Sequence, residues 1–201
     1  PVPLLADGLE KQVADKKVTN VVFKDSAPIK LNVGQNGFYR VNYSHEIQKK
    51  QLDALDKGLL SDVDRMSLLA DSFEATRAGY QPVNEYLDLL SHYEDEKSLS
   101  VWEIIASSIG AIRSTLSKSD EDNTLRESMK PHIHSLIRPN LERLGWDGVD
   151  GEPHLETMLR QIIVSMAAGS DEESTVKKAL SCYRDRVDNG VIINPDLRAI
   201  T

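Results

Sequence analysis

The chain of 201 residues carries a formal net charge of −8, with 40 % hydrophobic and 28 % charged residues. These values are typical of a globular protein with a buried core, in one domain or in a small and a larger one. The acidic balance, without a basic run, argues against a general binder of nucleic acid or anionic membranes. No segment reaches the roughly 20 apolar residues of a membrane span, so we expect neither nucleic acid nor membrane as a partner.

The segment from Ile29 to Ser44 predicts a β-hairpin that ends the N-terminal part of the chain. Apolar and polar residues alternate over 29–33, which is the period of a half-buried strand. Asn36-Gly37 tolerates the positive φ of a tight turn. The second strand would then present one face made of Tyr39, Val41 and Tyr43.

The residues before this hairpin also predict strands and turns. Thr19–Phe23 is rich in strand-forming residues, Asp7-Gly8 marks a turn, and Asp25–Pro28 a break. Three strands are few for a sheet with a closed core, so we expect unpaired edges and an uncovered face.

From about Ser44 onward the apolar spacing changes to the period of a helix. We expect helices at about 47–55, 61–79, 82–90, 100–116, 125–144, 153–166 and 170–190. Ser61 and Ser100 each resemble the start of a capping box, although the helix at Ser100 has room to begin a turn earlier. Pro131 and Pro139 predict a kink or break in the helix that contains them.

Each predicted helix has an apolar stripe that we expect to be buried. The clearest stripe is Trp102, Ile105, Ile109, Ile112 and Leu116. The others include Val63, Met66, Ala70 and Phe73; Val83, Tyr86, Leu87 and Leu90; Leu125, Met129, Ile133, Leu136, Ile137, Leu141 and Leu144; Leu155, Met158, Leu159, Ile162, Ile163 and Met166; and Val176, Leu180, Tyr183 and Val187.

Helix pairs with short connections and single stripes predict stacked antiparallel hairpins. The predicted fold class is therefore mainly α. It is an irregular α-superhelix, similar to HEAT or TPR arrays, over residues 45–201, and it is preceded by a small partial β-sandwich over residues 1–44.

Several landmarks in the chain carry a resemblance to a known family. Lys30-Leu31-Asn32 followed by Gly37–Tyr43 resembles the end of the β-sandwich domain of the zinc aminopeptidases related to aminopeptidase N and puromycin-sensitive aminopeptidase. Asp71-Ser72-Phe73 through Gly79 resembles the opening helix of that family's helical C-terminal domain. Leu144-Gly145-Trp146 and Gly151–His154 resemble landmarks between later helices. The resemblance covers nearly the whole chain, and a Pro-Asp-Leu-Arg stretch like residues 195–198 lies midway through the family's helical domain.

The resemblance implies a fragment of a peptide hydrolase. Residues 1–44 would be the last strands of the β-sandwich domain, and residues 45–201 a helical C-terminal domain that is truncated at its end. The parent enzyme would remove N-terminal residues from peptides, with a zinc-bound water as nucleophile and a glutamate as general base. The present segment would be non-catalytic and would shape or cap the substrate chamber. Its partners would be the missing catalytic domain and, in the parent, peptide substrates.

Two histidine motifs resemble parts of metal sites. His45-Glu46 has the first half of a His-Glu-x-x-His zinc motif, but Lys49 occupies the second histidine position and a protonated lysine has no lone pair. We expect a solvent-facing helix start there. His132 and His134 are two residues apart, so they point in different directions on a helix, and an extended segment alone would let them share a metal. We therefore assign no catalytic, cofactor-binding or metal-binding residue in this chain, and place zinc in the parent only.

Three further features receive structural interpretations. Cys182 is the single cysteine, so no internal disulfide forms, and we expect a small, buried or half-buried helix residue. Asn42-Tyr43-Ser44 matches the glycosylation pattern, which we interpret as accidental in a predicted strand. The lone cysteine and the absence of a signal sequence predict a cytoplasmic location.

Two other functions stay open at this stage. The chain is alternatively a stand-alone helical-repeat module that binds a peptide or protein in an inner groove, or, with little support, a metal enzyme built on His132 and His134. Exposed apolar strand faces in residues 1–44 would favour the fragment, and a closed β unit would favour the module.

Overall fold

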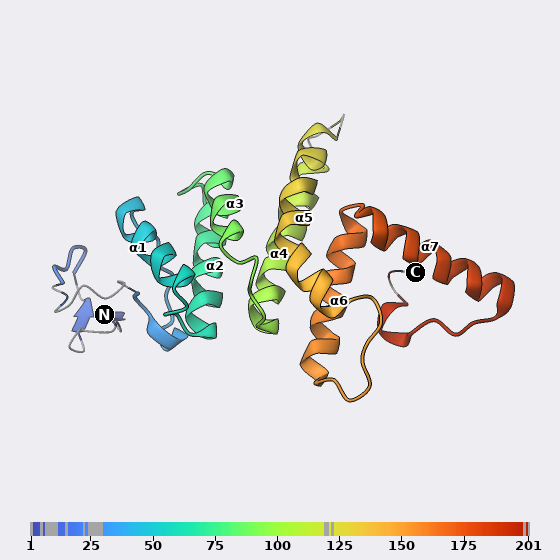
Figure 1. Cartoon of the computed structure of the whole chain (residues 1–201). Helices are drawn as coiled ribbons and strands as arrows, with labels where there is room; N and C mark the ends of the chain where they lie inside the picture. The colour runs from blue at the N-terminus through green and yellow to red at the C-terminus, as the bar shows by residue number, and fades with distance from the viewer. Residues whose placement is uncertain are drawn as a thin grey trace. The chain divides into compact units, whose positions relative to one another are not determined.

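The computed structural model describes residues 2–4, 6, 12–14, 16–21, 23, 30–118, 121, 123–198 and 200 (Figure 1). Within these residues, two short strands are followed by seven α-helices. The helices are α1 (His45–Asp56), α2 (Asp62–Arg77), α3 (Val83–Ser91), α4 (Leu99–Leu116), α5 (Thr124–Leu144), α6 (His154–Gly169) and α7 (Glu173–Asn189). None of the described helices combines the length and the apolar character that a membrane span requires.

The chain divides into two compact units, Pro1–His92 and Tyr93–Thr201. The mainly helical fold class is confirmed, because every α-helix follows Ser44 and strands occur only before it in the described residues. The change of secondary structure at Ser44 lies inside the first unit. The domain boundary between residues 44 and 45 therefore stays a prediction.

The described β structure is a two-stranded antiparallel sheet. Strand β1 (Val2–Leu4) pairs with β2 (Gln12–Ala14), and Pro3 lies opposite Val13. The turn expected at Asp7-Gly8 and the break expected at residues 25–28 lie outside the described residues. The strand expected at Thr19–Phe23 is wrong for residues 19–21 and 23, which form no strand, and residue 22 is not described.

The hairpin predicted for Ile29–Ser44 is wrong. Residue 29 lies outside the described residues, and residues 30–44 contain no strand, only the short 3-10 turn η1 (Val33–Gln35). Asn32 adopts the left-handed conformation at φ 56°. Its side chain accepts from the Gly37 amide at 2.6 Å and donates to the Gly37 carbonyl at 2.9 Å. This side chain thus takes the backbone groups that a cross-strand ladder would need.

We call residues Lys30–Tyr43 the strap, because they lie against α2 as an irregular loop. The strap contacts α2 through η1, and two of its cations pair with carboxylates of α2. A strand has a regular alternation of faces, whereas the strap is positioned by these individual polar contacts.

Helix α2 begins as the sequence predicts but buries a different face. The Ser61 side chain accepts from the Asp64 amide at 3.2 Å and donates to the Asp64 carboxylate at 2.7 Å, which caps the helix. Val63 is exposed, and the other three residues of the predicted stripe are only half-buried. The buried residues of α2 are Asp64, Ser67, Leu68, Leu69, Asp71, Ser72 and Ala75. The predicted stripe is wrong because the strap supplies polar partners that make buried carboxylates tolerable.

Helices α1 and α3 are joined at both ends by histidine–carboxylate pairs. His45 at the start of α1 lies 3.5 Å from Glu85 near the start of α3, and His92 after α3 lies 2.8 Å from Asp56 at the end of α1. The two helices therefore run in the same direction. The buried residues of α3 are Tyr86, Leu89 and Leu90; of the predicted stripe, Val83 is exposed and Leu87 half-buried.

The second unit contains α4, α5 and α6, which pack against one another (Figure 1). Helix α4 begins at Leu99, so the capping box predicted at Ser100 is wrong. The Glu96 carboxylate instead accepts from the amides of Lys97 and Ser98, just before the helix. The Glu96 carbonyl accepts from the Trp102 indole and from the Asn140 side chain, both at 2.8 Å. This carbonyl thus ties α4 to α5 inside the core.

Helix α5 is continuous through Pro131 and Pro139, so of the predicted kink or break the break is absent, and the kink stays a prediction. Each proline removes one backbone donor, but the buried stripe on both sides of Pro131 holds the helix against its neighbours. The buried residues of α5 are Met129, Ile133, Leu136, Ile137, Asn140 and Leu144, and Leu125 is exposed. Most of the predicted α5 stripe is thereby confirmed.

The last two helices expose apolar residues that the sequence predicted to be buried. Leu155 of α6 is exposed, as are Leu180, Tyr183 and Val187 of α7. Helix α7 packs on α6, and its buried residues are Thr175 and Ala179, on a face next to the predicted stripe. The prediction is wrong here because α7 has no neighbour on its apolar side in the described structure.

A buried ion pair connects α6 to the loop that precedes it. Arg160 is 4 % exposed and donates to both carboxylate oxygens of Glu152, and its Nε donates to the Leu144 carbonyl at 3.1 Å. Thr157 also donates to Glu152, at 2.8 Å. These donors, Arg160 above all, lower the pKa of Glu152 to about 2.

We predict that Glu152 contributes stability that depends on pH. Because its pKa is depressed in the folded state, the contribution is fully present above the ordinary value of 4.5 and is lost as the pH falls through about 2. Glu152→Gln should lower the midpoint of denaturant unfolding at neutral pH. The difference in midpoint between this variant and the unmodified chain should disappear as the pH falls from 4.5 to about 2. Denaturant unfolding across this range measures it. Glu142→Gln, on the exposed side of α5, is the control, and a gap that stays constant with pH would contradict the prediction.

Candidate functional site

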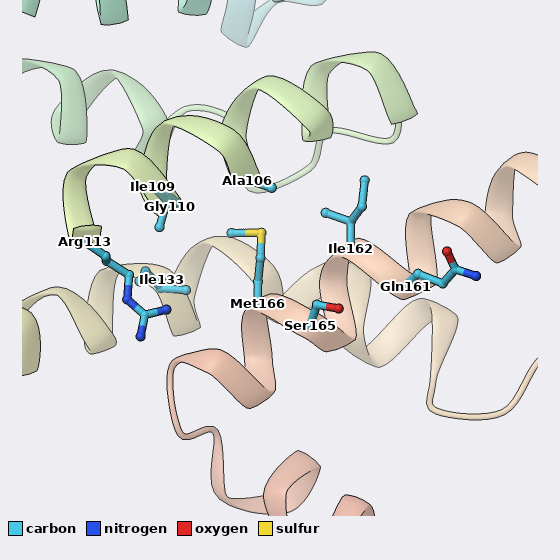
Figure 2. A pocket seen from close by; sticks show the side chains of 9 residues that line it. All are labelled: Ala106, Ile109, Gly110, Arg113, Ile133, Gln161, Ile162, Ser165 and Met166. Atoms are coloured by element: carbon cyan, nitrogen blue, oxygen red, sulfur yellow. The ribbon is translucent and has the colours of Figure 1, made fainter. Parts of the chain in front are cut away.

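A pocket of about 370 Å³ opens in the second unit beside α4 and α6 (Figure 2). We take it as the candidate site because it is concave and mostly apolar, as ligand sites are, and three helices form its walls. The lining residues are Ala106, Ile109, Gly110 and Arg113 of α4, Ile133 of α5, and Gln161, Ile162, Ser165 and Met166 of α6.

Helical spacing explains why these residues share a wall. The α4 residues recur at intervals of three, four and seven, which places them on one face of the helix. Ile162 and Met166 of α6 are four residues apart, and their side chains point toward α4 in Figure 2. Arg113 lies at one end of the row and Gln161 at the other. The pocket is thus a largely apolar trough with Arg113 at one end, Gln161 at the other and Ser165 between them.

Gly110 leaves part of the α4 wall open. A Cβ atom built on this residue would meet no heavy atom within 4 Å. Glycine in the interior of a helix costs about 1 kcal/mol relative to alanine, and no tight packing requires it here. The missing side chain widens the pocket and exposes the backbone of α4 to anything bound there.

Arg113 supplies the charge at the pocket. One of its guanidinium nitrogens donates to the carbonyl of Gly169, at the end of α6. Arginine carries five N–H donors, so further donors remain for a bound carbonyl or carboxylate. None of the lining residues is a histidine, cysteine or carboxylate. The pocket can therefore bind an apolar group with a nearby acceptor, but it holds no residue suited to acid–base or nucleophilic chemistry near neutral pH.

The histidine motifs lie elsewhere and on separate elements. His45 and Glu46 are exposed at the first turn of α1, where Glu46 pairs with Lys50, so the predicted solvent-facing helix start is confirmed. His132 and His134 both lie on α5, which excludes the extended segment that would let them share a metal. The His134 ring nitrogen Nε2 lies 2.9 Å from the Ser170 carbonyl oxygen.

Neither histidine motif fits a zinc ion in the part of the chain that the structure describes. Lys49 lies on α1 at the position where the motif needs a second imidazole. Among the residues that the structure describes, no three His, Cys, Asp or Glu side chains come together as a metal site would require. No catalytic step is therefore assigned to a metal held by this chain.

Sequence reasoning missed the pocket residues because they lie on three different helices. Arg113 and Gln161 look like ordinary surface residues in the linear sequence, and their proximity to the trough depends on how α4 packs on α6. Gly110 carried a signal, since a glycine inside a strong helical pattern is costly and suggests a local reason. Cys182 is half-buried on α7, as expected.

Comparison with known proteins identifies the family. Residues 28–201 match the family model described as the ERAP1-like C-terminal domain. The chain belongs to this family. The resemblance to the aminopeptidases that the sequence landmarks carried is thereby confirmed.

The relatives of this ERAP1-like C-terminal domain are named aminopeptidases. Aminopeptidase M1-A of Oryza sativa is 30 % identical over 178 residues, which is 87 % of this chain and 20 % of the relative. Alanine/arginine aminopeptidase of Saccharomyces cerevisiae is 27 % identical over 173 residues, or 86 % of this chain and 20 % of the relative. Puromycin-sensitive aminopeptidase of Caenorhabditis elegans is 26 % identical over 173 residues, which is 86 % of this chain and 18 % of the relative. The chain spans about one fifth of the length of these relatives.

We predict that Gly110→Ala stabilises the chain. The new methyl group meets open space, and alanine is the better helix former by about 1 kcal/mol. Gly145→Ala should have the opposite sign, because Gly145 ends α5 at φ 64°, where an L side chain is strained. Urea unfolding of both variants measures the pair. Destabilisation by Gly110→Ala would show that the α4 wall is packed more tightly than the pocket implies.

Proposed function

We propose that this chain is the non-catalytic, helical part of a zinc-dependent aminopeptidase, where it shapes or caps the chamber that holds the peptide substrate. The observation that carries the proposal is the family match over residues 28–201, together with relatives that are named aminopeptidases. In this proposal the zinc ion and the hydrolytic residues belong to a catalytic domain outside this chain. That domain and the peptide substrates are its partners.

Exposed apolar side chains in both parts of the chain support a fragment of a larger assembly. Before the first helix Val2, Val13, Val18 and Phe38 are exposed, and Phe38, in the strap, is fully exposed. On α7 the stripe Leu180, Tyr183 and Val187 faces solvent. Surfaces of this kind are typical of contacts with further protein. They fit the proposal that residues 1–44, with β1 and β2 as strands, belong to the end of a β-sandwich domain and that residues 45–201 are part of an α-superhelix.

The pocket beside α4 and α6 gives the chain a way to act on a substrate. An apolar trough with donors at its end binds side chains and carbonyl groups of a peptide without reacting with them. As a wall of the chamber it would contribute to peptide binding and to the positioning of the chain end, which raises the rate through orientation. The location we propose is the cytoplasm, which suits a chain whose single Cys182 forms no internal disulfide.

The second candidate function is a stand-alone helical-repeat module that binds a peptide or protein. The pocket alone is compatible with it. The exposed side chains Val2 and Val13 on the small sheet disfavour it, because an independent module needs a closed β unit.

The first test is hydrolysis by the purified chain. We expect no turnover of fluorogenic aminoacyl substrates, with or without added zinc, because the described residues hold no suitable metal site. Chelator-sensitive turnover that disappears in His45→Ala or His132→Ala would overturn the non-catalytic proposal.

The second test asks for the function in a complete enzyme. We would build a chimera in which this chain replaces the matching segment of the alanine/arginine aminopeptidase of Saccharomyces cerevisiae. We expect the chimera to be active, and Gly110→Leu, which fills the trough, to raise KM several-fold for peptides of several residues while sparing single-residue substrates. Ser107→Leu, on an exposed position of α4 outside the pocket, is the matched control. An inactive chimera, or equal effects of the two variants, would count against the proposed role.

A further inference from the structure

The strap is held on α2 by two carboxylates of the same helix face. Asp64 and Asp71 are seven residues apart, which is two turns, or about 10.5 Å along the axis. Both residues are buried, with exposed fractions of 7 % and 3 %. Buried carboxylates on a helix require partners from another segment, and the strap provides them.

Each carboxylate holds one amide and one cation of the strap. Asp64 accepts from the Gly34 amide at 2.9 Å, and the Lys30 ammonium lies 3.9 Å from the same oxygen. Asp71 accepts from the Arg40 guanidinium at 3.1 Å and from the Val41 amide at 3.3 Å. The two ends of the strap are therefore fastened by two clamps of the same composition, with two positive and two negative charges in all.

The strap is also closed on itself. The Leu31 amide donates to the Tyr43 hydroxyl at 3.0 Å, and this hydroxyl donates back to the Leu31 carbonyl at 3.4 Å. Burial raises the pKa of Tyr43 to about 12. Asn32 holds Gly37 from inside, and a Cβ on Gly37 would lie 2.4 Å from the Tyr39 ring. The hydroxyl of Tyr43 and the side chain of Asn32 thus connect distant residues of the strap to one another, although Tyr43 also hydrogen-bonds to Gln51 of α1.

The attraction between opposite charges in the clamps does not fully offset the desolvation of the buried charged groups. Burial lowers the pKa of Lys30 and raises the pKa of Asp71, in spite of the opposite charges nearby. Both directions mean that the charged forms are less favourable at this site than in water. Ion pairs whose attraction is offset by desolvation add little net stability. They suit a contact that opens without unfolding the helices.

We propose that the strap, Lys30–Tyr43, is a latch that detaches from α2 as one unit, with Asp64 and Asp71 as its two fastening points. Because the strap links the residues before it to α1, its release would loosen one attachment of these residues to the helices of the first unit. This proposal does not depend on the aminopeptidase assignment.

Amide hydrogen exchange of Asp71→Asn tests whether the two clamps act together. Asparagine keeps the shape of the side chain but removes the charge that binds Arg40. We expect exchange to rise on the order of 10-fold or more at the Val41 amide and also at the Gly34 amide, whose own acceptor Asp64 is unchanged. The amides of Leu69 in α2 and Leu89 in α3, both buried, should exchange at the same rates as in the unmodified chain.

The control is Asp62→Asn, the same substitution at an exposed residue of α2 that pairs with Arg65 rather than with the strap. It should leave all four amides unchanged. Faster exchange at Val41 alone would show that Asp71 makes only a local contact, and it would overturn the latch. Faster exchange in the strap and the helices together would indicate unfolding of the whole unit, and it would overturn the latch as well.

A second variant covers the case in which Asp71→Asn does not fold. Arg40 is 58 % exposed, so Arg40→Gln removes the cation of one clamp with little effect on the core. The same pattern is expected, with faster exchange at both Gly34 and Val41 and none in the helices. Unchanged exchange at Gly34 in this variant would equally overturn the proposal.

Discussion

The first unit depends on the pairing of buried carboxylates on α2 with the segment before α1. A helix that carries Asp64 and Asp71 on its inner face cannot bury that face against apolar side chains alone, because an unpaired buried charge is very costly. The strap resolves this by presenting backbone amides and two cations to the same face. The path of residues 30–43, and the absence of a hairpin there, follow from this one requirement.

The second unit is organised around buried polar groups that join helices to loops. The carbonyl of Glu96 accepts from Trp102 and Asn140, and Arg160 ties α6 to Glu152 and to the end of α5. These contacts position α4, α5 and α6, and the pocket beside α4 and α6 is a consequence of that packing. Its apolar walls and terminal arginine are suited to binding rather than to catalysis.

The residues that carry the family resemblance are also residues that hold the strap on α2. Lys30, Asn32, Gly37, Arg40 and Tyr43, which carried the resemblance in the sequence, are members of the strap network, and Asp71 of the second landmark is its partner on α2. The landmark residues of this ERAP1-like C-terminal domain thus have an identifiable physical task. They attach the last residues before the helices to the first long helix of the domain.

The sequence by itself determined the order of the helices, most of their ends and the family, because capping residues, glycines and apolar periodicity act over a few neighbouring residues. Ser61 begins α2 and Gly190 follows α7 as their local chemistry requires. The tertiary structure decided which faces of α2 and α7 are buried and where the pocket lies. Val63 is exposed while Asp64 is buried, and Leu180 is exposed while Ala179 is buried, because burial depends on which neighbour packs against each face. The alternation of apolar and polar residues over 29–33 is equally compatible with a strand and with a loop held by side chains. The loop forms because Asp64 and Asp71 of α2, more than twenty residues later, bind backbone amides and cations of this segment.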